Sequence, residues 1–462
     1  GTNSTCYQVD ITRNAQGQYV ASAFLIGGNS PLAADSGEIF IKLDWSSLSS
    51  LGGPSTTTIA NTAAAALLST NLIPALGGRA LAELPLHLAG HSRGSSVVAE
   101  MARFLGAQGL WVDQVTTLDP HPVGSFGDPA MKNYANILFA DNYWQNLGDN
   151  FFVPNGQTIS GAYNRQLTDL NGGNGSSHSD VHLWYHGTID TMVPLTVDGS
   201  TINATQRQTW WTTNETAGAT TGFYYSLAGG GDRLSNLEPA GVGNGRIRDG
   251  YNKIWDLGAG VAMNRDSLPA NNGAWPNVLK LNISGTNRFS VDEAVALSFY
   301  TQFGATTSLT AEVRFFLDAD ANPYTANNVE ILQTNIWATG TANVSVSSLN
   351  VPLNPTNTVP GTYNLFARIH DGVRTRYLYA PQKLILLPSR RAPILSAPRL
   401  ENAQFRFTVS GFAGQTIVVQ SSTNLWQWTS ISTNTMGTSP VEILDATVSN
   451  LPQRFYRAVL FP

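Results

Sequence analysis

A serine with a glycine two residues to either side stands in the segment Gly90-His91-Ser92-Arg93-Gly94. Glycines at this spacing let a sharply bent backbone carry a serine from the end of a strand onto the start of a helix. Because glycine makes up 43 of the 462 residues, the spacing alone is weak evidence. The flanks strengthen it: residues 84–89 are strand-like and residues 95–105 have helical spacing. We therefore predict that Ser92 is a nucleophile.

A serine hydroxyl reacts only when a base removes its proton and an acid orients that base. Two aspartates follow strand-like runs, Asp119 in "TTLDP" and Asp141 in "ILFAD". The carboxyl ends of parallel strands meet at one edge of a sheet, so either aspartate could lie beside Ser92. Each could equally cap or turn the chain after its strand, and both stay candidates on this reasoning.

Three histidines at intervals of four residues, His178, His182 and His186, are the candidates for the base. We favour His178, which follows a Gly/Asn/Ser loop and precedes a predicted helix start at Ser179-Asp180. His182 lies inside that helix and could bond locally. The same interval would suit zinc ligands, but the segment lacks the glutamate that a zinc-protease helix carries between its ligands. Ester hydrolysis is the better hypothesis.

Up to about residue 190, strand-like runs alternate with helical patterns, which predicts a mostly parallel sheet with flanking helices. From about residue 278 the apolar period becomes two, which predicts a β-sandwich. A proline-rich linker over 388–398 leads to a second, smaller β unit. We expect three domains, 1–275, 276–388 and 389–462, with 190–275 an extension of the first whose role is open.

Composition excludes several classes of function. The net charge of −5 and the lack of Lys/Arg runs argue against nucleic-acid binding. Cys6 is the only cysteine, so an intrachain disulfide and a cysteine metal cage are impossible. No run approaches eighteen apolar residues, so we expect no transmembrane segment. Charged residues make up only 12 %, which suits an extracellular surface. Residues 1–4 do not resemble a signal peptide, and we expect a secreted or surface-bound bacterial protein from which the signal has been removed.

The motifs resemble the lipase branch of the α/β hydrolases, in the manner of pancreatic-type triglyceride lipases. A strand ending in "LDW" at 43–45, the helix after it, "GHSRGS" at the elbow and "TLDP" after the next strand carry this resemblance. It implies an α/β-hydrolase fold and makes Asp119 the acid. The family's histidine precedes two aromatic residues by six and seven positions, as His178 precedes Trp184 and Tyr185. Asp141 stays the fallback.

Further expectations concern the oxyanion hole and the two β units. The segment "FLIGGNS" stands where the family has its His-Gly oxyanion strand, so we expect the backbone N–H groups of Arg93 and of Gly28 or Asn29 to hold the oxyanion. Residues 276–388 look Ig-like, and the last seventy residues resemble a β module at the ends of exported proteins from Verrucomicrobia-type bacteria. "LDADANPY" has the Asp-x-Asp-x-Asn spacing of a calcium loop, but Pro323 replaces the glycine, so a β-turn is preferred.

The expected function is a secreted serine carboxylic-ester hydrolase, an esterase or lipase that forms an acyl-enzyme without a cofactor. Its substrate would be a lipid, a small ester or a polymer-linked acyl group, and we expect a monomer. One alternative is a carbohydrate or polyester esterase whose β domains bind the polymer. A second is a non-catalytic glycan-binding or adhesion protein with an inert hydrolase fold.

Overall fold

The structure is a computed structural model. It describes residues 4–33, 37–50, 52–148, 154–170, 173–189, 203–210, 265–268, 274–304, 310–338, 344–354, 357–448 and 451–461. The predicted extension over 190–275 lies outside the described residues except for 203–210, 265–268 and 274–275. No described helix is long and apolar enough to cross a membrane.

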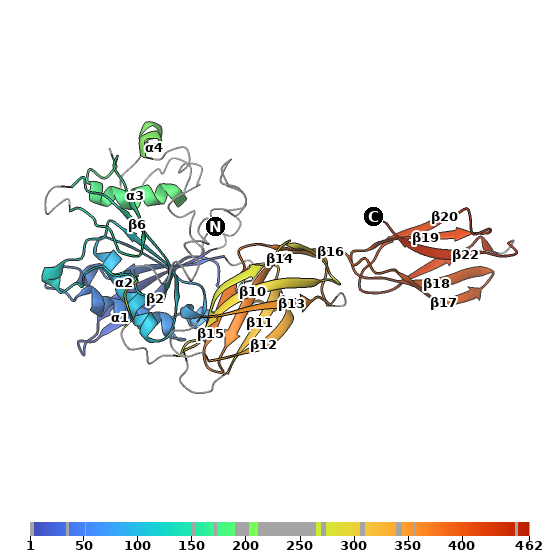
Figure 1. Cartoon of the computed structure of the whole chain (residues 1–462), viewed down its shortest axis with the longest axis horizontal. Helices are drawn as coiled ribbons and strands as arrows, with labels where there is room; N and C mark the ends of the chain where they lie inside the picture. The colour runs from blue at the N-terminus through green and yellow to red at the C-terminus, as the bar shows by residue number, and fades with distance from the viewer. Residues whose placement is uncertain are drawn as a thin grey trace.

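Three units lie in a row along the longest axis of the molecule (Figure 1). The N-terminal unit contains these elements in chain order: β1 (Thr5–Arg13), β2 (Tyr19–Gly28), β3 (Ile39–Asp44), α1 (Thr56–Leu68), β4 (His87–His91), α2 (Arg93–Ala107), β5 (Val112–Leu118), β6 (Ile137–Trp144), β7 (Tyr163–Gln166), α3 (Ser177–Ile189) and α4 (Ala204–Trp210). Short 3-10 helices cover Ser46–Leu48, Pro74–Leu76, Leu81–Glu83 and Gly124–Phe126.

The sheets of this unit contradict the predicted α/β-hydrolase fold. Its strands form two sheets, one with the order β2-β1-β3 and one with the order β4-β5-β6-β7. Within the described part of the chain, the second is the one sheet whose strands are all parallel, and four strands do not make an α/β-hydrolase core. Over the whole described chain, strand predominates over helix.

The prediction failed because strand pairing is not local. Alternation of strand-like and helical runs indicates connections, but it does not say which strands become neighbours. Here the first two strands fold back on each other as an antiparallel hairpin. The hairpin closes through a turn in which Asn14 N–H donates to the Gln18 carbonyl at 2.9 Å. The chain then adds β3 parallel to β1, so a mixed sheet results.

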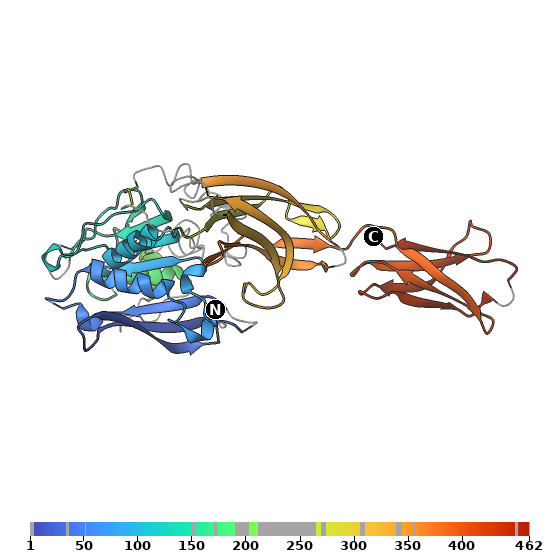
Figure 2. The same cartoon turned by 90° about the horizontal axis from the view of Figure 1, so that it is seen from below.

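Helix α2 is separated from β4 by Ser92 alone and packs on α1. Its buried apolar face includes Val97, Met101 and Leu105 at intervals of four residues, the period of a helix face. The hydroxyl groups of Thr56 and Ser96 lie 2.8 Å apart between the two helices. Figure 2 shows the dark blue β2-β1-β3 sheet on one side of these helices. This packing fixes the place where β4 passes into α2.

The other two units consist of strands. The middle unit contains β8 (Asn277–Ile283), β9 (Arg288–Ser290), β10 (Ala294–Gln302), β11 (Thr310–Asp318), β12 (Val329–Trp337), β13 (Val344–Pro352), β14 (Gly361–His370), β15 (Thr375–Tyr379) and β16 (Leu384–Leu387). The C-terminal unit contains β17 (Ile394–Glu401), β18 (Gln404–Ser410), β19 (Thr416–Ser422), β20 (Thr429–Thr435), β21 (Val441–Asp445) and β22 (Phe455–Leu460). In each unit one apolar core draws side chains from strands of two sheets. Part of the predicted linker over 388–398 is strand β17.

Candidate active site

Ser92 forms the turn between β4 and α2. Its backbone has φ 55° and ψ −125°, a conformation that residues other than glycine rarely adopt. Ser92 N–H donates to the Leu118 carbonyl at 2.9 Å, and the Ser92 carbonyl accepts from Ser95 N–H at 3.0 Å and from His121 N–H at 3.3 Å. The serine therefore stands at the amino end of α2, where the helix dipole favours a negative charge.

The two glycines beside Ser92 differ in what they allow. A Cβ at Gly90 would lie 2.2 Å from the Gly94 carbonyl oxygen, whereas a Cβ at Gly94 would meet nothing within 4 Å. We expect Gly90→Ala to lower the free energy of unfolding by about 1–3 kcal/mol, as overpacking does. Gly94→Ala is the matched control and should stay near wild type in thermal unfolding. An equal loss of stability in the two variants would contradict the close contact inferred at Gly90.

His178 lies in the first turn of α3, which begins one residue before it. The helix is anchored by its buried face, where the Trp184 ring packs tilted against the Tyr143 ring of β6, with their centroids 5.1 Å apart. His178 Nε2 lies 2.9 Å from Ser92 Oγ, and His178 Nδ1 lies 2.6 Å from Asp119 Oδ2. Because a carboxylate accepts, Nδ1 carries the proton, which leaves Nε2 to accept the proton of the serine hydroxyl.

Asp119 follows β5 directly and is completely buried. Besides His178, its carboxylate has a second partner, Gln145. Gln145 N–H donates to Asp119 Oδ1 and Gln145 Nε2 donates to Asp119 Oδ2, both at 2.8 Å. Gln145 is itself buried, and its side chain also donates to the Pro154 carbonyl and accepts from Leu147 N–H. Both oxygens of the Asp119 carboxylate therefore accept hydrogen bonds, which fix its position.

Sequence reasoning missed Gln145 and its neighbour in the site, Gly156. A Cβ at Gly156 would lie 2.1 Å from Asp119 Oδ1, so only a glycine leaves room for the carboxylate. Gly156 N–H donates to the Gln145 carbonyl. Gln145 directly follows the end of β6. A polar residue at the carboxyl end of a parallel strand is a candidate site residue, and this position could have identified Gln145.

Asp141 does not meet His178 in the structure. It lies inside β6, three residues before the strand ends, and pairs with Thr116 of β5. Its Oδ1 accepts from the Thr116 hydroxyl at 2.6 Å and from Gln114 Nε2 at 3.2 Å. The structure thus brings Ser92, His178 and Asp119 together and leaves the fallback acid in the sheet.

The buried Asp141 carboxyl gives stability a pH dependence. Burial raises its pKa to about 6, against 3.8 for an ordinary aspartate, although Thr116 and Gln114 donate to it. The folded state therefore holds a proton between about pH 4 and 6 that the unfolded state has lost, and stability falls as pH rises through this window. We expect Asp141→Asn to reduce that fall by about 1–3 kcal/mol. Denaturant unfolding at pH 4.5 and 7 measures it; equal pH dependence in wild type and variant would refute the expectation.

Arg93 is the first residue of α2, so its backbone N–H has no acceptor within the helix and lies beside Ser92. Its side chain binds the loop that follows β3. The guanidinium pairs with Asp128 at 2.6 Å, stacks at 5.0 Å over the Trp45 ring and donates to the Ser49 carbonyl. These contacts hold the loop after β3 against the turn between β4 and α2.

Gly28 and Asn29 do not lie at the elbow. Gly28 pairs with Thr5, the first residue of β1, and Thr5 pairs with Ile39, the first residue of β3. The loop bound by Arg93 follows the other end of β3, about 17 Å away at 3.3 Å per residue. The expected oxyanion role of these two residues is therefore not supported. Their placement was missed because β2 runs antiparallel to β1 and returns to the amino end of the sheet.

The two metal hypotheses weighed on the sequence find no assembled site. Among the described residues, no group of three or more His, Cys, Asp and Glu side chains could hold a metal ion. The carboxylates of the "LDADANPY" segment instead accept turn hydrogen bonds: Asp318 from Asp320 N–H and Asp320 from Asn322 N–H. Asn322 also donates to the Pro31 and Ala33 carbonyls of the N-terminal unit.

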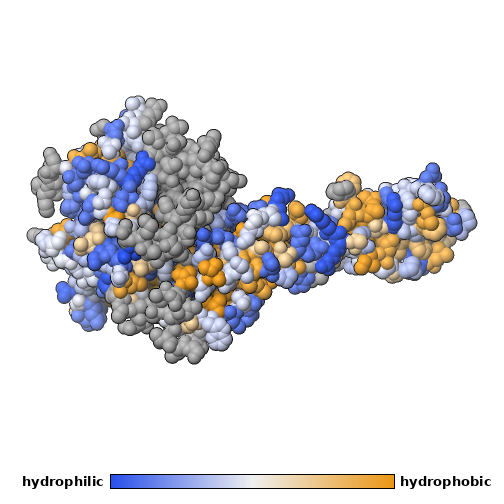
Figure 3. All heavy atoms as spheres, viewed as in Figure 1, coloured by the Kyte–Doolittle hydropathy of each residue, from blue (hydrophilic) through white to orange (hydrophobic). Residues whose placement is uncertain are grey.

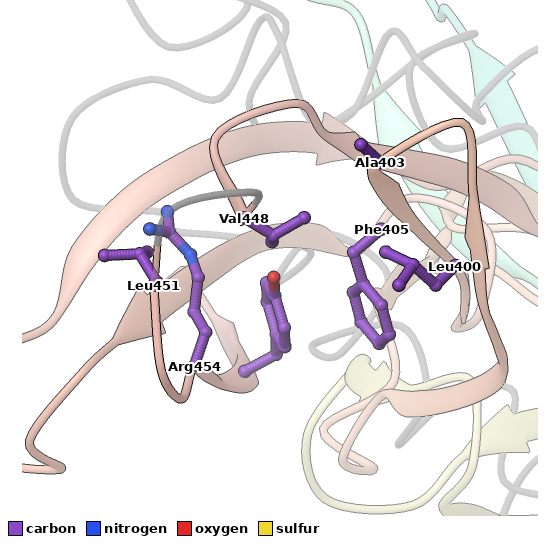
Figure 4. A pocket seen from close by; sticks show the side chains of 7 residues that line it. Leu400, Ala403, Phe405, Val448, Leu451 and Arg454 are labelled. Carbon is purple, nitrogen blue, oxygen red and sulfur yellow. The ribbon is translucent and has the colours of Figure 1, made fainter.

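A cavity of about 430 Å³ lies in the C-terminal unit, away from this site (Figure 4). Phe405 and Tyr456 stack at 4.9 Å on its wall. The same unit displays apolar residues on the face shown in Figure 3, and Trp426 and Leu400 are 90 % and 68 % exposed. The cavity shares no residue with the Ser92 site.

Comparisons with known proteins add little to this geometry. No protein-family model and no curated protein matches the chain. Among solved structures, the C-terminal domain of wzt is 12 % identical over 25 % of this chain and 75 % of its own, with a TM-score of 0.19. A CARDB domain from Pyrococcus furiosus is 11 % identical over 24 % of this chain and 90 % of its own, with a TM-score of 0.16. A β-glucosidase from Kluyveromyces marxianus is 9 % identical over 25 % of this chain and 15 % of its own, with a TM-score of 0.15. These likenesses carry no conclusion about this chain.

Proposed function

We propose that the protein is a serine carboxylic-ester hydrolase. One observation carries the proposal: the hydrogen-bonded series from Ser92 Oγ through the His178 ring to Asp119, with distances of 2.9 and 2.6 Å. A nucleophile bonded to a base, with the base bonded to a buried acid, is the arrangement that activates serine in unrelated folds. The proposal therefore depends on the site and not on the fold.

The residues divide the reaction between them. Ser92 Oγ attacks the ester carbonyl carbon while its proton passes to His178 Nε2. The C–O bond to the alcohol then breaks, and His178 returns the proton to the leaving oxygen, which gives a free alcohol and an acyl-Ser92 ester. Water attacks this ester with the same assistance, so the acid is released and Ser92 regains its proton. Asp119 stabilises the imidazolium that forms in each step.

The electrostatics at Ser92 suit the charge that develops on the carbonyl oxygen. The backbone N–H of Arg93 is the oxyanion donor that we propose, because it is the first N–H of α2 and adjoins the nucleophile. The Arg93 guanidinium is bonded to Asp128, so the role of this side chain is to hold the turn between β4 and α2. Loss of one oxyanion donor costs about 10²–10³ in kcat in a well-studied serine protease.

The test is hydrolysis of p-nitrophenyl esters from acetyl to palmitoyl, with Ser92→Ala and Ser177→Ala beside the wild type. Ser177 precedes His178 in α3, so its variant removes a neighbouring hydroxyl outside the bonded series. We expect activity in wild type and Ser177→Ala and at least a 10³-fold loss in Ser92→Ala. A fluorophosphonate should label Ser92, as read by peptide mass spectrometry. An inert wild type that also resists the label would refute the proposal, and glycan pull-downs would then test the binding-protein alternative.

A further inference from the structure

His91 precedes Ser92 on β4, and its ring lies against the base. His91 Nε2 is 2.7 Å from the backbone carbonyl oxygen of His178, and the two ring centroids are 4.7 Å apart. A carbonyl oxygen can only accept, so Nε2 carries the proton of the His91 ring and donates it. A side chain next to the nucleophile thus binds the main chain of the base.

We propose that His91 is a positioning residue that holds His178 in line with Ser92, an inference that rests on the proposed hydrolase function. His91 is the last residue of β4, and Ser92 follows it directly. His178 comes from a different element, the first turn of α3, 86 positions later in the chain. The hydrogen bond of the His91 side chain therefore links the strand that leads to the nucleophile with the main chain of the base.

This link matters because proton transfer tolerates little displacement. A catalytic group must be held within about 0.5 Å of its productive place, and a misplacement of about 1 Å can cost 10²-fold in rate. Asp119 fixes the His178 ring from the Nδ1 side, but it does not fix the main chain from which the ring projects. His91 adds a restraint at that main chain, beside the packing of α3 through Trp184.

The surroundings of His91 keep it in the form that this role needs. Burial lowers its pKa to about 3, and the nearby rings of His178 and His182 act in the same direction. The His182 ring lies 5.0 Å away on α3. A neutral His91 keeps a single N–H for the carbonyl, and it adds no positive charge beside the imidazolium that His178 becomes during the reaction.

Three substitutions separate the hydrogen bond from the packing of the ring. His91→Gln places an amide nitrogen near the position of Nε2 and keeps the donor. His91→Phe keeps a ring of similar size without a donor, and His91→Asn keeps a donor that stops near the position of Nδ1. We expect kcat for p-nitrophenyl esters to fall about 10–100-fold in the Phe and Asn variants, with KM within about twofold, and to recover most of the way in His91→Gln.

Equal kcat in wild type and His91→Phe would overturn the proposal, and so would equal losses in the Gln and Phe variants. Nuclear magnetic resonance gives a second readout that does not need activity. The His178 Nδ1 proton that bonds to Asp119 should give a sharp downfield signal in wild type and His91→Gln and a weakened one in the other two variants. An unchanged signal in all four proteins would overturn the proposal. If wild type hydrolyses no ester, the proposed function fails, and this signal alone decides the role of His91.

Discussion

Replacing Asp119 with asparagine is expected to lower kcat for ester hydrolysis about 10⁴-fold, as loss of the acid does in serine proteases, with a small change in KM. Among the described residues, three N–H groups donate to the Asp119 carboxylate. Oδ1 accepts from Gln145 N–H, and Oδ2 accepts from Gln145 Nε2 and from His178 Nδ1. An asparagine amide must turn its NH₂ group toward one of these donors, so it cannot keep the set of bonds. If the NH₂ group faces His178, it donates to Nδ1. The ring proton then lies on Nε2, which can no longer accept from Ser92.

Asp141→Asn is the matched control, because it makes the same change at a second buried aspartate of the same sheet. It should keep kcat within about threefold of wild type, since Asp141 bonds to Thr116 and Gln114 and not to His178. Burst kinetics with p-nitrophenyl acetate, together with thermal unfolding of each variant, measure both effects. The assignment of the acid fails if Asp141→Asn loses more activity than Asp119→Asn.

The positions of Ser92, Asp119 and His178 could be predicted from the sequence because each of these residues stands at a local boundary. Ser92 follows a strand and opens a helix, Asp119 follows a strand, and His178 comes at a helix start, and all three boundaries are marked by glycine, proline or capping residues. The choice between Asp119 and Asp141 could not be made from the residues themselves. It depends on β6 continuing three residues beyond Asp141, a matter of register with its neighbours.

The predictions that failed concerned contacts between residues far apart in the sequence. The mixed β2-β1-β3 sheet arises from a hairpin whose direction reverses, and the expected oxyanion residues Gly28 and Asn29 are carried with it to the amino end of β1. The predicted α/β-hydrolase fold fails for the same reason, since local periodicity identifies strands but not their partners. Gln145 and Gly156 were missed because polar contacts to a buried carboxylate leave no period in the sequence.

The second large effect is expected at the junction of the N-terminal and middle units, where Arg376 of β15 is fully buried. Its guanidinium donates to the Ala82 carbonyl at 2.7 Å, to the Leu84 carbonyl at 2.8 Å and to the Trp111 carbonyl at 2.9 Å, and it pairs with the buried carboxylate of Asp113. All four partners belong to the N-terminal unit. A side chain of one unit therefore satisfies the buried polar groups of the other.

We expect Arg376→Ala to lower the free energy of unfolding by about 3–5 kcal/mol, because it leaves the Asp113 charge buried without its cationic partner. Arg374→Ala is the control: that guanidinium is 34 % exposed and lies 3.5 Å from Asp371, so its loss should cost less than about 1 kcal/mol. Denaturant unfolding followed by tryptophan fluorescence compares the two.

A double variant separates the charge from the contact. Arg376→Met with Asp113→Leu removes both buried charges, and apolar replacement of a buried pair is often neutral. If the cost of Arg376→Ala comes from the orphaned carboxylate, the double variant recovers most of it. If the double variant is as unstable as the single one, hydrogen bonds to the main chain carry the stability: the three that Arg376 donates to carbonyls and the one that Asp113 accepts from Leu86 N–H. In either case the middle unit contributes to the stability of the unit that holds Ser92. Asp113 lies on β5, Trp111 directly precedes that strand, and Ala82 and Leu84 lie in the segment that leads into β4.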